Sequence, residues 1–110
     1  MNQEEFHASF EQMTKTQRMV LKSFLANQID EAIAKNLNLD ASTVRRHISN
    51  LCRIFGLKNE SGEHFSYRQE LIELFAKFRP DLVSSELLKG VKLEFPDGQV
   101  SVFKMFLSDT

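Results

Sequence analysis

Apolar residues recur at helical spacing through most of the first eighty positions of the chain. The repeat is sharpest between residues 33 and 57, where an apolar side chain returns every three or four positions. Its members are Ile33, Ala34, Leu37, Leu39, Val44, Ile48, Leu51, Cys52 and Phe55. The pattern predicts two helices, over about 31–37 and Ala41–Phe55. A short helix, a tight turn and a longer helix make a helix-turn-helix.

The residues at the ends of these two helices agree with that interpretation. Asn38 suits the turn, because asparagine tolerates the left-handed backbone that ends a helix. Asp30 and Asp40 are expected to be N-caps, whose carboxylates accept hydrogen bonds from free backbone N–H groups. Gly56 is expected to end the second helix in the left-handed conformation.

Three more helices are predicted around this pair, over residues 2–12, 15–26 and 67–79. The first places Phe6 and Phe10 on one side, where they could cover the core. Thr14 and Gln17 have the spacing of a capping box at the start of the second. Pro80 stops the third, which is strongly apolar and supplies the fourth helix of a compact core. Its apolar stripe is wide enough to suggest either core packing or a dimer contact.

The C-terminal part of the chain has a different pattern. Residues 81–90 could form a short helical turn, and residues 91–95 alternate apolar and charged side chains. A turn at 96–99 then leads into the apolar run 100–107, so these segments predict a β-hairpin. A lone hairpin is marginally stable, so it would pack on the helices, pair with a second copy or belong to a larger chain.

The buried face of the longer helix defines the predicted core. We expect Val44, Ile48, Leu51, Cys52 and Phe55 to pack against Leu21, Phe24 and Ile33. Because Cys52 is the only cysteine, the chain forms no internal disulfide, and a buried structural thiol is expected.

The opposite face of the same helix carries hydrogen-bond donors and no acidic residue. They are Ser42, Thr43, Arg45, Arg46, Ser49, Asn50 and Arg53. Such groups bind phosphates and base edges. The net charge of the chain is −1, yet residues 15–58 alone carry +5. The positive charge therefore coincides with the helix-turn-helix, as binding to a phosphate backbone requires.

This stretch resembles the LuxR-type (GerE-like) DNA-binding domain family of bacteria. Residues 33–57, IAKNLNLDASTVRRHISNLCRIFGL, meet the family pattern without a gap, and residues 13–26 match its first helix. Thr43-Val44 with His47 and Asn50 is the most specific part. The turn at 27–31 departs from the pattern, being one residue shorter and lacking its Gly and Lys.

The resemblance implies a role for each residue on the exposed face. Base contacts in the major groove are expected from Arg45, Arg46 and Ser49, and DNA backbone contacts from Thr43, His47, Asn50 and Arg53. It implies a mainly α fold, a LuxR/GerE-like four-helix domain at 13–80. An N-terminal helix or arm at 1–12 would precede it, and an extension with the hairpin at 81–110 would follow and could dimerise.

Other kinds of function find little support in the sequence. The three histidines are scattered, glycines occur only at helix ends or turns, and no run is long enough to cross a membrane. We therefore expect no enzyme activity, no metal, no cofactor, no small-molecule ligand and no membrane. The expected function is a cytoplasmic, homodimeric transcriptional regulator that binds double-stranded DNA. The alternative is a protein-interaction adaptor, the N-terminal effector-type module of a larger bacterial signalling protein. Three unpaired arginines on one face favour DNA.

Overall fold

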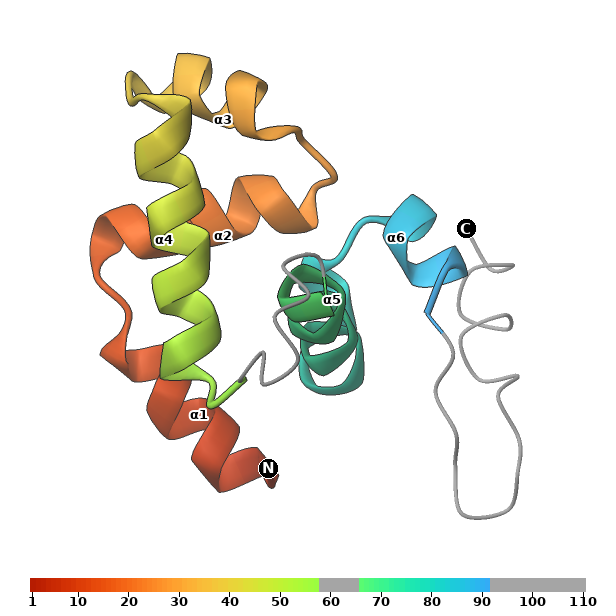
Figure 1. Ribbon diagram of the computed structural model, residues 1–110. Coiled ribbons are helices and arrows are strands. Elements are labelled where there is room, and N and C mark those ends of the chain that lie inside the picture. The colour runs from red at the N-terminus through yellow and green to blue at the C-terminus, as the bar shows by residue number, and fades with distance from the viewer. Residues whose placement is uncertain (58–65, 92–110) are drawn as a thin grey trace.

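The computed structural model describes residues 1–57 and 66–91, and every regular element within these ranges is a helix (Figure 1). The elements are α1 (Gln3–Gln12), α2 (Lys15–Leu25), α3 (Asp30–Leu37), α4 (Ala41–Ile54), α5 (Ser66–Phe78), the 3-10 turn η1 (Pro80–Leu82) and α6 (Ser85–Lys89). The mainly α prediction is confirmed for this part of the chain. The predicted hairpin lies almost entirely outside the described residues. No described helix has the length and apolar character needed to cross a membrane.

Two reciprocal capping boxes start the first two helices. At α2 the Gln17 N–H donates to Thr14 Oγ1 (3.1 Å), and the Thr14 N–H donates to Gln17 Oε1 (2.8 Å), as predicted. Asn2 and Glu5 make the same pair of bonds at α1, with lengths of 2.8 and 3.2 Å. Each box satisfies backbone donors that a helix start leaves free.

Left-handed residues end both helices of the helix-turn-helix, as the sequence predicts. Asn38 has φ +58° and Gly56 has φ +72°. After each of them the next N–H reaches back across the last turn, from Leu39 to the Ala34 carbonyl and from Leu57 to the Cys52 carbonyl, both at 2.8 Å. This is the Schellman arrangement, which stops a helix and redirects the chain.

The prediction that Asp30 and Asp40 form N-cap hydrogen bonds was wrong. Ile29 occupies the N-cap position of α3, and Asp30 is already the first helical residue. The Asp30 carboxylate is engaged by Arg68 of α5 instead. Asp40 does take the N-cap position of α4, but its exposed carboxylate makes no capping hydrogen bond.

The core forms where α2, α3 and α4 meet, with α5 packed against α4. Figure 1 shows α4 with α3 near one end and α1 near the other. All eight residues of the predicted core are buried, at 0–7% exposed: Leu21, Phe24, Ile33, Val44, Ile48, Leu51, Cys52 and Phe55. The interior of the helix-turn-helix thus follows the prediction in full.

An aromatic cluster joins α1 to the C-terminal end of α4 and to α5. The ring of Phe6 lies 5.3 Å from Phe55, 5.0 Å from Phe75 and 4.8 Å from Phe78, measured between centroids. Phe6 itself is 4% exposed. The expectation that the N-terminal helix covers the core is therefore confirmed.

Candidate nucleic-acid interface

Helix α4 is divided sharply into two faces. Val44, Ile48, Leu51 and Cys52 follow one another at steps of four, three and one, which places them on a single side of a helix. These side chains are at most 2% exposed. The rotation of α4 about its axis is therefore fixed by the core, and the polar side chains between them must face outward.

The outward face contains all the residues predicted to contact DNA. The three predicted base contacts, Arg45, Arg46 and Ser49, are all exposed. Among the predicted backbone contacts Arg53 is exposed, whereas Thr43, His47 and Asn50 are half-buried. Exposed groups thus lie beside half-buried ones on the same helix. Thr43, His47 and Asn50 recur at steps of four and three, so the half-buried residues lie along one edge of the exposed face.

His47 is half-buried on this face, like Thr43 and Asn50. Its Nδ1 atom is buried and has no hydrogen-bond partner among the described residues.

The prediction of three unpaired arginines on α4 was wrong for Arg45. Its Nη1 atom lies 3.9 Å from Asp30 Oδ2, which makes a long ion pair. Arg46 and Arg53 form no ion pair within residues 1–57 and 66–91. Asp30 lies in the first turn of α3, and α3 packs against α4, so the Asp30 carboxylate comes within reach of the Arg45 side chain.

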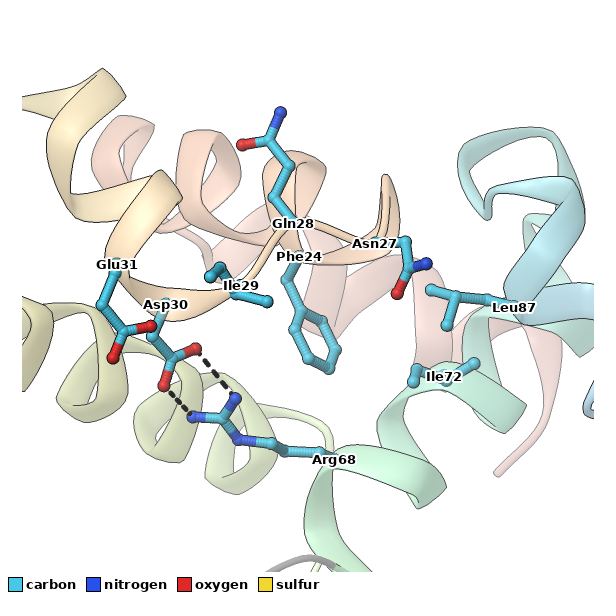
Figure 2. Close-up of a pocket in the computed structure, with 9 residues that line it drawn as sticks. All are labelled: Phe24, Asn27, Gln28, Ile29, Asp30, Glu31, Arg68, Ile72 and Leu87. Atoms are coloured by element: carbon cyan, nitrogen blue, oxygen red, sulfur yellow. Dashed lines mark hydrogen bonds and ion pairs between the residues drawn. The ribbon is translucent and has the colours of Figure 1, made fainter.

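Arg68 is a residue that the sequence reasoning missed. Its two terminal nitrogens donate to the two carboxylate oxygens of Asp30, each at 2.9 Å (Figure 2). It also lines a cleft of about 180 Å³ between α4 and α5, together with Arg45 and Ser49. Asp30 and Arg68 are 38 positions apart, so no local pattern could reveal the pair.

The same ion pair also lines a second cleft, which Figure 2 shows. It has a volume of about 330 Å³ and is bounded by the corner between α2 and α3, by α5 and by α6. Ile29 stands at this corner and is 67% exposed. None of the predicted DNA contacts lines it, and the sequence reasoning did not identify it.

The thiol of Cys52 belongs to the buried side of α4 and takes no part in the interface. Burial raises the pKa of Cys52 to about 11, and its Sγ atom lies 3.8 Å from the Tyr67 carbonyl oxygen. A thiol in this state stays protonated at neutral pH and is a poor nucleophile.

Comparison with known families identifies one match. Residues 11–62 match the GerE family model, which describes bacterial regulatory proteins of the luxR family. No curated protein and no solved structure matches the chain. The matched segment takes in α2, α3 and α4, whereas α5 with Arg68 lies outside it. The resemblance found in the sequence is thereby confirmed.

Proposed function

We propose that α4 enters the major groove of double-stranded DNA. Residues 11–62 match the luxR family of bacterial regulatory proteins, whose helix-turn-helix implies DNA-binding transcriptional regulation. The supporting observation is the exposed face of α4. It presents Arg45, Arg46 and Arg53 without an acidic residue anywhere on the helix. Such a face is attracted to a polyanion, and a helix fits the major groove.

The division into base contacts and backbone contacts is the one that the family resemblance implies. Arg45, Arg46 and Ser49 are exposed and would meet base edges, where an arginine forks onto O6 and N7 of guanine. Arg53 lies two turns further along α4 and would meet a phosphate, as would Thr43, His47 and Asn50, which lie along one edge of the exposed face. The protein would act in the cytoplasm, where bacterial DNA lies.

Two copies of the chain would bind a two-fold symmetric site. A single helix-turn-helix covers little DNA, and a dimer presents two recognition helices about 34 Å apart. Leu74 and Phe78 of α5 are one candidate contact. Both are half-buried, and the ring of Phe78 already stacks on Phe6. The apolar run 100–107 is the other candidate, on the grounds of its sequence alone.

Binding to random duplex DNA at several salt concentrations tests this function. Arg45→Ala and Arg46→Ala should each flatten base preference, since a correct arginine–guanine pair is worth about 1–3 kcal/mol over a wrong base. Arg53→Ala should weaken binding to all sequences alike and lower the salt slope by about one. Lys89→Ala is the matched control, because it removes the same charge from the exposed end of α6. It should leave base preference unchanged.

If the double variant Arg45→Ala/Arg46→Ala binds duplex DNA at low salt as tightly as wild type, α4 is not the reading helix. The adaptor function would then be the better description of this domain.

The oligomeric state has its own test. Sedimentation should compare the full chain with a version that ends at Val91. This version keeps Leu88, which is 3% exposed and belongs to the core. If the full chain is a dimer and 1–91 a monomer, residues 92–110, which include the run 100–107, carry the contact. A dimer in both versions would assign the contact to residues 1–91.

A further inference from the structure

The carboxylate of Asp30 lies between two arginines from different helices. Arg68 of α5 binds it through two parallel hydrogen bonds of 2.9 Å, and Arg45 of α4 approaches one of its oxygens to 3.9 Å. The first contact is a bidentate pair, the strongest geometry available to an arginine and a carboxylate. The second is longer than a hydrogen bond. Asp30 is therefore committed to Arg68 and only loosely shared with Arg45.

Solvent exposure follows the same order. The side chain of Asp30 is 12% exposed, that of Arg68 35% and that of Arg45 53%. The Arg68 guanidinium also lies over the ring of Phe24, 5.8 Å from its centroid, which limits its movement. A nearly buried carboxylate needs a cationic partner, because leaving it unpaired is costly. Arg68 meets that need and keeps the more exposed Arg45 free to turn outward.

We propose that Asp30 and Arg68 are positioning residues that control whether the Arg45 side chain is free to contact DNA. This proposal rests on the DNA-binding function proposed above. Arg68 satisfies the carboxylate, so Arg45 can leave it for a base edge. When Arg68 is lost, Asp30 draws Arg45 into a tighter pair, and DNA must compete with an acidic residue for that side chain. Asp30 thus opposes the reading of DNA by Arg45, and Arg68 cancels that opposition.

Substitutions of Asp30 and of Arg68 should change DNA affinity in opposite directions, although the two residues form one ion pair. Arg68→Gln should weaken binding by roughly two- to fivefold, the range expected for a partly exposed ion pair that DNA must break. Asp30→Asn should bind as tightly as wild type or more tightly. The double variant Asp30→Asn/Arg68→Gln should match Asp30→Asn, because no carboxylate then remains to hold Arg45.

The readout is fluorescence anisotropy on a labelled duplex recovered from a random pool by wild-type protein. Thermal melting of each variant checks that the domain is folded. Arg68→Lys serves as a second variant, since it keeps a cation beside Asp30 and should lose less affinity than Arg68→Gln. In an Arg45→Ala background, Arg68→Gln should have no further effect on affinity.

Several results would overturn the proposal. If Arg68→Gln weakens binding equally in the Asp30→Asn and Arg45→Ala backgrounds, Arg68 itself contacts DNA. If the Asp30→Asn variant is folded and binds DNA more weakly than wild type, the Asp30 carboxylate favours DNA binding by Arg45 and does not oppose it. The proposed function would survive without this inference if Arg45→Ala weakened DNA binding while Asp30→Asn and Arg68→Gln left the affinity unchanged. Absence of any wild-type binding would overturn the proposed function together with this inference.

Discussion

Replacing Ile48 by alanine tests whether the two faces of α4 are oriented as described. Ile48 is 2% exposed and lies in the middle of the buried stripe. The change removes three carbon atoms from the core, worth roughly 2–3 kcal/mol in transfer free energy alone. Incomplete collapse of the cavity raises the expected loss to about 2–5 kcal/mol. Small domains are stabilised by about 5–15 kcal/mol, so this loss is a large part of the total.

The assay is thermal unfolding followed by circular dichroism, with DNA binding measured well below the transition. The melting temperature should fall by roughly 10 °C or more, while the folded fraction still binds DNA through an intact outer face. Arg46→Ala is the control on the opposite side of the same helix. It should change stability by less than about 0.5 kcal/mol and yet lose base preference. Equal melting of Ile48→Ala and wild type would mean that α4 is rotated relative to this description.

Three further changes test other parts of the fold. Phe6→Ala should cost about 3–5 kcal/mol in urea unfolding, because its ring joins α1 to α4 and α5; a small loss would mean that α1 is dispensable. Asn38→Gly should be tolerated, whereas Asn38→Ala should cost about 1 kcal/mol at φ +58°; equal stability of the two would contradict the left-handed turn. The thiol of Cys52 keeps its proton up to a pKa of about 11 when folded and loses it near 9 when unfolded. The free energy of unfolding should therefore fall between these pH values by up to about 1.4 kcal/mol per unit, and Cys52→Ala should remove that part of the slope.

Sequence reasoning succeeded where the physical signal is local. The spacing of Val44, Ile48 and Leu51 fixes which side of α4 is buried, because a helix offers only one face to a neighbouring core. The residues that end the two helices of the helix-turn-helix were also predicted correctly from the sequence. Asn38 and Gly56 take the left-handed conformation that their residue types tolerate.

Prediction from the sequence failed where a side chain can bind either a local group or a residue that is distant in the sequence. Asp30 has the residue type of an N-cap, but a bidentate arginine offers a charged carboxylate a stronger contact than backbone N–H groups do. Arg68 is supplied by α5, and its position depends on how that helix packs against α4. No pattern within the helix-turn-helix contains that information. The same contact explains why Arg45 is partly paired, contrary to the prediction.

The acidic start of α3 also bears on how this domain can approach DNA. Asp30 and Glu31 occupy the first turn of α3, where the helix dipole favours negative charge. That choice stabilises α3 but places a carboxylate, the exposed Glu31, where a phosphate would otherwise meet free N–H groups. If the proposed function holds, we expect the charged contact with the DNA backbone to come chiefly from Arg53 of α4. If the domain binds DNA through this one helix, each copy should contribute little affinity, and this is a further reason to propose that two copies bind together. It also makes the availability of Arg45, and hence the state of the Asp30 carboxylate, matter more than it would in a domain with a basic α3.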